Sequence, residues 1–134
     1  MTVLVDTSVW SLALRRDPPD VPELHELRRV LAGGDLVATT GLIIQELLQG
    51  LVTATSREGI RERMSRMSQI SVELDDHTAA AEAFVRCRER GIQLGTVDAL
   101  IATLCTRRGH TLLTTDRDFT LAAPHLGLRV WRPG

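Results

Sequence analysis

Short apolar runs alternate with longer amphipathic segments from one end of this chain to the other. A short apolar run bounded by polar residues is typical of a buried strand. Apolar residues spaced three and four positions apart are typical of a helix that covers a sheet. Strands that alternate with helices favour a parallel sheet between helical layers. The pattern therefore predicts an α/β fold, a three-layer α/β/α sandwich around a short parallel sheet of about four to five strands.

The same pattern, with its glycine and proline breaks, gives the individual elements. We expect strands over residues 2–5, 36–38, 70–74, 111–114 and 128–130. We expect helices over residues 8–14, 22–31, 40–49, 56–67, 76–90 and 96–108, and a short helix after Asp116. Thr40 and Thr96 are the expected N-caps of their helices, because threonine side chains commonly cap a first turn.

The composition predicts one soluble domain. A chain of 134 residues can bury a core without disulfides, so we expect a single domain over residues 1–134. Cys87 and Cys105 lack a CxxC partner, and the four histidines lack the spacing of zinc ligands. The N-terminus has no basic lead, and no apolar stretch approaches the ~20 residues that span a bilayer. We therefore expect a cytoplasmic protein with reduced thiols.

The charged residues exclude several functions. All 16 basic residues are arginines, and the formal net charge is −1, without the positive excess that usually accompanies non-specific nucleic-acid binding. A P-loop is excluded because its loop requires a lysine. Phosphotransferases that form an aspartyl phosphate also use a late lysine, and one type needs a second aspartate where this chain has Ser8. The GxSxG elbow of a serine hydrolase is absent from the sequence.

Two acidic residues lie just beyond predicted strands, Asp6 directly after the first and Asp116 shortly after a later one. Asp6 follows the first strand, and Asp116 follows the strand in the sequence LLTTDRD. The carboxyl ends of parallel strands meet at one edge of a sheet, where α/β proteins bind their ligands. Each residue also has a purely structural interpretation, because Asp6 could cap the next helix and Asp116 could close an Asx turn.

Two more acidic residues lie on the apolar faces of predicted helices. Glu46 follows Leu42 and Ile43 at helical spacing, and Asp98 precedes Ile101 at the same spacing. An unpaired charge on a buried face is costly, so a positive group should compensate both residues. Alternatively, Asp98 in a first turn could serve only the helix dipole, and Glu46 could be a solvated surface residue.

Together the four carboxylates indicate a cation site. Carboxylates that lie close together cannot all stay ionised without a positive partner, and the chain has no lysine to supply one. Hard oxygen ligands select Mg²⁺ or Mn²⁺. Such an ion can generate hydroxide near neutral pH and neutralise charge that builds on a phosphate. The pattern favours hydrolysis of a phosphodiester bond without a protein nucleophile.

Four segments carry a family resemblance: VDTSVW, IIQELLQG, TVDALIATLC and LLTTDRDF, in this order along the chain. As a set they resemble the PIN domain, and more narrowly the VapC-type toxins of bacterial toxin–antitoxin pairs. The resemblance covers nearly the whole chain. It implies a PIN-like three-layer fold and endoribonuclease activity with one or two Mg²⁺ or Mn²⁺ ions. It also implies a homodimer and inhibition by a cognate VapB-like antitoxin, in a heterotetramer or larger complex.

The resemblance assigns roles to residues as well. The family's catalytic and metal-binding acids map onto Asp6, Glu46, Asp98 and Asp116. Glu46 is expected either to bind a second ion or to act as the base that orients the attacking water.

Neighbouring polar residues are expected to support the acids. Thr7 and Ser8 match the family's small polar residues after the first acid. Ser8 and Thr115 are expected to orient carboxylates by hydrogen bonds, or else to serve in capping and turn formation. Asp118 matches a frequent further acid of the family, and it either supports the site or caps the helix at Phe119.

Binding surfaces are less clearly marked. Arg15, Arg16 and Arg86 are the candidate contacts to RNA phosphates. A set of large apolar residues indicates either a docking groove for a partner or simply core, namely Trp10, Leu12, Leu14, Leu47, Leu48 and Leu51. The competing interpretation of the whole chain is a non-catalytic PIN-like interaction module, which keeps the fold and does not use a metal.

Overall fold

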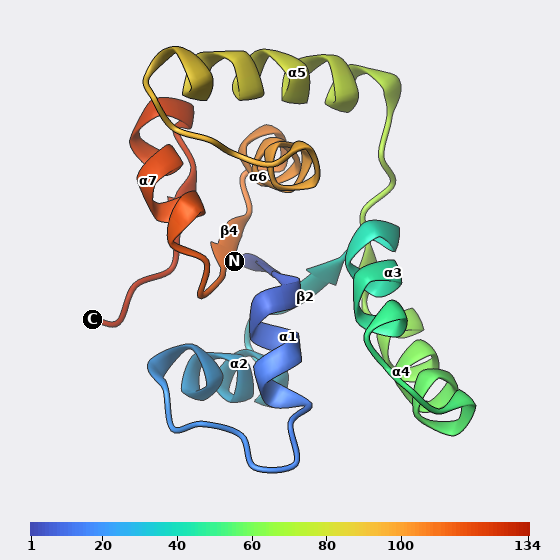
Figure 1. Ribbon diagram of the computed structural model, residues 1–134. Coiled ribbons are helices and arrows are strands. Elements are labelled where there is room, and N and C mark those ends of the chain that lie inside the picture. Colours follow the sequence, from blue (N-terminus) through green and yellow to red (C-terminus); the bar gives the residue numbers. More distant parts are fainter.

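A computed structural model describes all residues from Met1 to Gly134. Five parallel strands form one sheet in the order β3-β2-β1-β4-β5, and seven helices accompany it (Figure 1). The strands are β1 (Thr2–Val5), β2 (Leu36–Thr39), β3 (Ser68–Gln69), β4 (Thr111–Leu113) and β5 (Arg129–Val130). The helices are α1 (Thr7–Ala13), α2 (Pro22–Ala32), α3 (Gly41–Gln49), α4 (Ala54–Ser65), α5 (Leu74–Glu89), α6 (Thr96–Arg108) and α7 (Arg117–Leu126). The predicted α/β fold with a short parallel sheet is confirmed.

The helices lie on both sides of the sheet. α5, α6 and α7 gather on one side, and α1 and α2 lie on the other (Figure 1). α3 and α4 form a helical hairpin beside the edge of the sheet that β2 and β3 occupy. None of the helices combines the length and the apolar composition that a membrane crossing requires.

The central strand β1 fixes the edge of the sheet at which the acidic residues gather. Val3, Leu4 and Val5 are all buried, as expected of a parallel strand that is covered on both faces. β1 pairs with β2 on one side and with β4 on the other, where Val5 lies opposite Leu113. The backbone N–H of Asp6 donates to the carbonyl oxygen of Leu113 at 2.9 Å, so the pairing continues past the end of the strand.

One hydrophobic core of 29 buried residues joins the layers. Trp10 and Leu47 belong to it, with exposed fractions of 7% and 4%, and are therefore not part of a free groove. Leu12, Leu48 and Leu51 are partly buried, and Leu14 is exposed at 37%. Of the apolar residues that the sequence analysis assigned to either a groove or the core, Trp10 and Leu47 are therefore core residues.

Two predicted elements differ from the structure. Instead of a strand over residues 70–74, the chain forms the two-residue strand β3, and Leu74 already begins α5. The backbone N–H of Glu73 donates to Asp76 Oδ2 at 2.8 Å, which commits this segment to a helix start. Thr96 is the first residue of α6 rather than its N-cap, which is Gly95. Thr40 occupies the N-cap position of α3, but its side chain makes no capping bond.

A buried ion pair joins the start of α5 to the end of α6. The Asp76 side chain is 1% exposed. Its Oδ1 accepts from Arg107 Nε at 2.9 Å, and its two oxygens accept from the Arg108 guanidinium at 3.0 and 2.8 Å. These bonds, first of all those from Arg108, hold the pKa of the Asp76 carboxyl well below its usual range. The carboxylate is therefore fully compensated inside the protein.

We expect Asp76→Asn to lower the free energy of unfolding by about 2–4 kcal/mol at pH 7, because it leaves two arginines without their shared partner. A carboxyl whose pKa is lowered by folding stabilises the fold above its ordinary pKa of 3.8, and this contribution is lost as the pH falls further. The deficit should therefore shrink in acid. Urea unfolding at several pH values measures it, with the exposed neighbour Asp75→Asn as control. Equal stability of Asp76→Asn and the native protein at pH 7 would contradict this account.

Candidate active site

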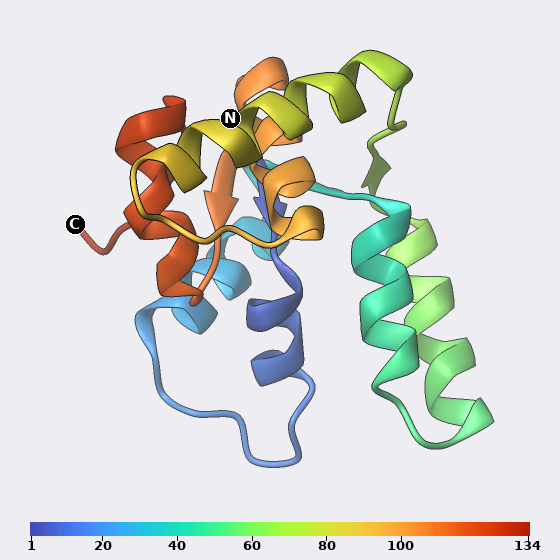
Figure 2. The same ribbon diagram turned by 45° about the horizontal axis from the view of Figure 1, so that its top comes forward.

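The four predicted acidic residues come from four different parts of the fold. Asp6 follows β1, Asp116 precedes α7, Glu46 lies within α3, and Asp98 lies in the first turn of α6. Because β1 and β4 are neighbours, the first turns of α1 and α7 lie beyond the same edge of the sheet (Figure 2). Asp6 and Asp116 are thus at the carboxyl edge, where parallel sheets bind ligands.

Asp6 is held by a set of hydroxyl groups. Its side chain is buried, and its Oδ2 accepts from Ser8 Oγ at 2.7 Å and from Thr114 Oγ1 at 2.9 Å. The same oxygen caps α1 by accepting from the backbone N–H of Ser8 at 3.4 Å. Its Oδ1 makes no hydrogen bond. The capping interpretation of Asp6 is therefore correct, and it leaves one carboxylate oxygen available for a ligand.

Thr114, rather than Thr115, has the side chain that supports the acids by hydrogen bonds. Thr114 is buried and bonds both strand-end acids: its Oγ1 donates to Asp6 Oδ2 and accepts from the backbone N–H of Asp116 at 3.0 Å. The Thr115 side chain is exposed, and only its backbone N–H takes part, donating to Ser8 Oγ at 3.1 Å. The register of β4 against β1 is the signal that could have identified Thr114, because it places Thr114 directly beside Asp6.

Asp116 closes an Asx turn, as its structural interpretation predicted, and is also the N-cap of α7. Its Oδ1 accepts from the backbone N–H of Asp118 at 2.9 Å, and its Oδ2 makes no hydrogen bond. Asp118 lies in the first turn of the helix and is not its cap. Like Asp6, Asp116 uses one carboxylate oxygen for the backbone and leaves the other available.

Glu46 differs from its prediction. It is exposed rather than turned into the core, because Ile43 and Leu47 carry the buried face of α3. Its position is nevertheless fixed, since its Oε1 accepts from Thr7 Oγ1 at 2.9 Å. Thr7 therefore ties α1 to α3 and holds Glu46 beside the first turn of α1.

Asp98 shows how closely the acids approach one another. The side chain is half-buried, and burial together with the negative charges of Asp6, Asp116, Glu46 and Asp118 raises its pKa to about 6. The four charges that act on it most strongly are all acidic. In contrast to Asp76, this carboxyl has no arginine beside it that offsets the cost of its charge.

The carboxylates gather at one place without converging on a single point. As the side chains are placed, no three acidic, histidine or cysteine residues form a group that could hold a metal ion. Asp6, Asp116 and Glu46 are each turned toward a hydroxyl or backbone donor instead. The donor set itself, hard carboxylate oxygens that repel one another and lack a cation, matches what a divalent hard ion binds.

Residues 3–123 match the family model of the PIN domain. The chain belongs to the PIN-domain family. The match covers most of the 134 residues, and it confirms the resemblance drawn from the four sequence segments. No curated protein matches the chain in sequence.

Solved structures share the fold of this PIN domain. VapBC-1 from nontypeable Haemophilus influenzae is similar with a TM-score of 0.75 and 16% identity, over 98% of this chain and 97% of that one. VapBC2 from Rickettsia felis, bound to a DNA fragment from its promoter, gives 0.73 and 21%, over 98% and 100%. VapC20 from Mycobacterium tuberculosis, a toxin that cleaves the sarcin–ricin loop, gives 0.72 and 23%, over 98% and 99%. At these identities the likeness shows the fold.

The three candidate arginines lie in different surroundings. Arg15 and Arg16 are exposed just after α1 and make no ion pair. Arg86 lies on the side of α5 that faces Thr103 and Leu126, at the junction of α5, α6 and α7. None of the three is among the charges that act most strongly on Asp98.

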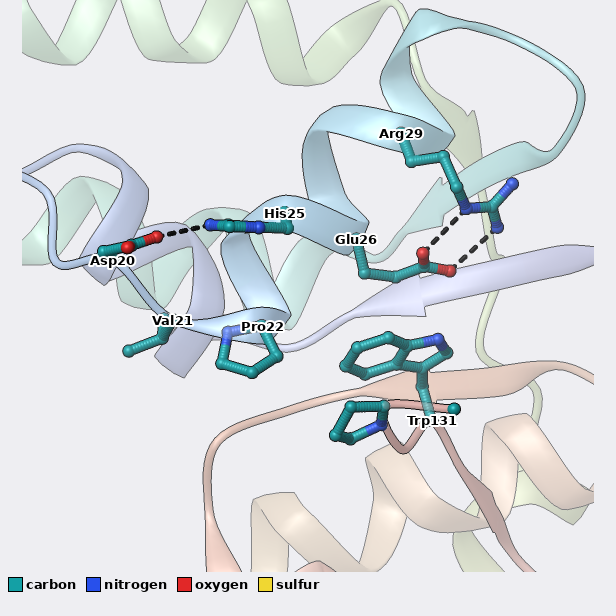
Figure 3. A pocket seen from close by; sticks show the side chains of 9 residues that line it. Asp20, Val21, Pro22, His25, Glu26, Arg29 and Trp131 are labelled. Carbon is teal, nitrogen blue, oxygen red and sulfur yellow. Dashed lines mark hydrogen bonds and ion pairs between the residues drawn. The ribbon is translucent and has the colours of Figure 1, made fainter.

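A cavity of about 490 Å³ in this PIN domain lies away from the acids, between the start of α2 and the C-terminal residues. Trp131 lies beneath the side chains of α2 in it (Figure 3). Its charges are already matched, because Arg29 pairs with Glu26 at 2.7 Å and His25 lies 2.5 Å from Asp20. None of the four predicted acids lines it, so it is not the site that the sequence predicts.

We expect the contribution of Asp98 to the stability of this PIN domain in EDTA to fall as the pH rises from about 4 to above 6. Folding raises the pKa of Asp98 to about 6, so the folded state prefers the protonated carboxyl, and the charged form at higher pH is destabilising. Asp98→Asn should therefore raise the free energy of unfolding at pH 7 by about 1–2 kcal/mol, a range that allows for solvent screening. The gain should disappear near pH 4.

Urea unfolding across this pH range tests the expectation, with the exposed Asp17→Asn as control. A destabilised Asp98→Asn at pH 7 would contradict it. Such a result would indicate that Asp98 serves the dipole of α6 rather than a site of excess negative charge.

Proposed function

We propose that this PIN domain is an endoribonuclease that hydrolyses RNA phosphodiester bonds with one or two Mg²⁺ or Mn²⁺ ions, as the toxin of a VapBC-type toxin–antitoxin pair. The observation that carries the proposal is the surroundings of Asp98. Its strongest electrostatic neighbours are four acids, and the strand-end acids Asp6 and Asp116 each keep one oxygen without a hydrogen bond. A purely structural cluster would be expected to include its own cations, as Asp76 does.

The ligand set that we propose is Asp6, Glu46, Asp98 and Asp116. Ser8 and Thr114 fix Asp6 through its Oδ2, which leaves Oδ1 for a metal. Thr7 fixes Glu46, which either binds a second ion or accepts the proton of the attacking water. Such hydroxyl partners commonly orient metal-binding carboxylates.

A bound divalent ion supplies hydroxide near neutral pH and neutralises charge on the phosphate. The chain itself contributes the placement of the carboxylates at the ends of β1 and β4. It supplies no lysine and, beside Asp98, no arginine that could neutralise them instead. The phosphate of a substrate would therefore meet a repulsive surface in the absence of the ion, so we expect binding of RNA to depend on it.

RNA as the substrate and a toxin's role are supported by relatives of the same fold. VapC20 of Mycobacterium tuberculosis is a toxin that cleaves the sarcin–ricin loop, VapBC-5 of the same organism is a member of the VapBC family of toxin–antitoxin systems, and another structure of this fold is a toxin–antitoxin complex from Klebsiella pneumoniae. We propose by analogy that a VapB-like antitoxin inhibits this PIN domain. The competing function, a non-catalytic interaction module, predicts the same fold without use of the metal.

The first test is cleavage of a mixed RNA pool by antitoxin-free protein with Mg²⁺, Mn²⁺ or EDTA. We expect cutting with either metal and none in EDTA. Asp6→Ala should reduce kcat/KM by more than the 10- to 100-fold that is typical of residues that only orient a metal ligand. The exposed Asp17→Ala removes the same charge elsewhere and should cut normally. Cutting that persists in EDTA or in Asp6→Ala would contradict the proposal.

Thr114→Val provides a graded variant in the same assay. It removes the hydroxyl that bonds Asp6 and Asp116 but keeps the shape of the buried side chain. We expect a loss of about 10- to 100-fold in kcat/KM that higher Mn²⁺ concentrations partly restore. Failure of all variants and of the native protein to cut, with no metal bound in calorimetry, would favour the interaction module.

An exposed apolar groove supports the proposed homodimer. A cavity of about 470 Å³ lies between α5 and α6 and is lined mainly by apolar side chains, with Phe84, Val85 and Val97 among them. Val85 and Val97 are 38% and 36% exposed, so part of this apolar lining is open to a partner. Sedimentation equilibrium should show a dimer for the native chain and a monomer for Val85→Glu. A monomeric native chain would contradict the assignment.

A further inference from the structure

A third cavity lies next to Asp98 and offers groups of a different chemistry. It has a volume of about 320 Å³ and is formed by the end of α5 and the loop to α6. Its lining residues are Phe84, Arg88, Ile92, Gln93, Leu94 and Gly95. Gly95 connects it to the site, because a Cβ atom on Gly95 would lie 3.7 Å from Asp98 Oδ2. A ligand that occupies this cavity would therefore lie close to Asp98, one of the proposed metal ligands.

The loop that forms the cavity is firmly held. α5 ends at Glu89, and Gly91 turns the chain with a φ of 74°. The backbone N–H of Ile92 then donates to the carbonyl oxygen of Cys87 at 2.9 Å, and Leu94 is 2% exposed. The cavity is thus a fixed feature of the fold, as ligand sites usually are.

Arg88 makes no ion pair within the protein. Its guanidinium carbon lies 5.7 Å from the centroid of the Phe84 ring, a cation–π distance, and it has no carboxylate partner. Other arginines such as Arg66 and Arg108 do pair with carboxylates. Arg88 is also not among the charges that act most strongly on Asp98, so it does not compensate the acids. The planar guanidinium of Arg88 is therefore available to a ligand that lies between Arg88 and the acidic residues.

Gln93 adds a donor and an acceptor at the same place. Its side chain is exposed and makes no hydrogen bond within the protein. Glutamine amides pair with the edges of bases, and guanidinium planes and aromatic rings stack on the faces of bases. The cavity therefore offers a stacking surface, a hydrogen-bonding edge and a positive charge next to a cluster of carboxylates.

We propose that this cavity binds the unpaired base of the RNA nucleotide next to the cleaved phosphate, with the base stacked on Arg88 and its edge bonded to Gln93. The inference rests on the proposed nuclease function and names the form of its substrate. A base within a duplex cannot turn into such a cavity, so the site selects single-stranded or looped RNA. Arg88 and Gln93 act in binding and in base preference, and the carboxylates act in cleavage.

The test uses a randomised single-stranded RNA pool cut with Mn²⁺, with the cut ends sequenced. We expect a base preference at one position beside the cut that Gln93→Ala removes, while preferences at other positions remain. Arg88→Ala should raise KM about tenfold or more and change kcat little, as expected for loss of one stacked base. Arg28→Ala removes one exposed positive charge on α2 and is the matched control, which should leave KM unchanged.

Arg88→Lys separates stacking from charge. Lysine keeps the positive charge but lacks the planar group, so this variant should resemble Arg88→Ala. Full activity of Arg88→Lys, or an unchanged KM and base preference in both alanine variants, would overturn the subsite while leaving the nuclease intact.

A measurement of RNA binding without cleavage tests this proposal independently of the nuclease proposal. If the native protein does not cut RNA, retention of the same pool on filters decides the matter. Weaker retention by Arg88→Ala than by Arg28→Ala would support the subsite without the nuclease. Equal retention by the two variants, or no retention by the native protein, would overturn it.

Discussion

The pairing of β1 with β4 is the constraint on which the site depends. It sets Val5 against Leu113 and continues in the bond from Asp6 N–H to the Leu113 carbonyl. Thr114 is thereby placed beside Asp6 and bonds both strand-end acids. A shift of one residue in this register would turn Thr114 to the opposite face and leave the Asp6 carboxylate without its main support. The β-ladder thus determines the side-chain geometry of the site as well as the fold.

Two poorly exposed carboxylates of this protein illustrate opposite uses of the same group. Asp76 is surrounded by two arginines that lower its pKa, and it joins α5 to α6. Asp98 is surrounded by acids that raise its pKa to about 6. A buried charge that lacks a partner is normally selected against because of its desolvation cost. Since the chain pairs Asp76 so completely, the unpaired state of Asp98 supports the proposal that this site binds a cation from solution.

The sequence predicted the layers and the edge of the sheet more securely than it predicted the details of side chains. Asp6 and Asp116 follow buried strands, and that pattern is local, so their placement could be predicted. Glu46 could not be placed correctly from periodicity, because the apolar stripe of α3 is centred on Ile43 and Leu47 and leaves Glu46 exposed beside it. The supporting role of Thr114 depends on the register between two strands that are far apart in the sequence. Its contact with Ser8, for example, joins residues 106 positions apart. No local sequence pattern contains this register.

The arginines of this chain differ in whether a carboxylate already pairs with them. The acids repel a phosphate, and several arginines are already paired with carboxylates, as Arg61 is with Glu58 and Arg108 with Asp76. Arg88 is available beside a cavity that reaches Asp98, and Arg15 and Arg16 are available beyond α1. Under the proposed function, Arg88 would hold the nucleotide next to the cut while the scissile phosphate lies against the acidic residues. Under the proposed function, a protein with a net charge of −1 would bind RNA through a few well-placed cations rather than through a basic surface.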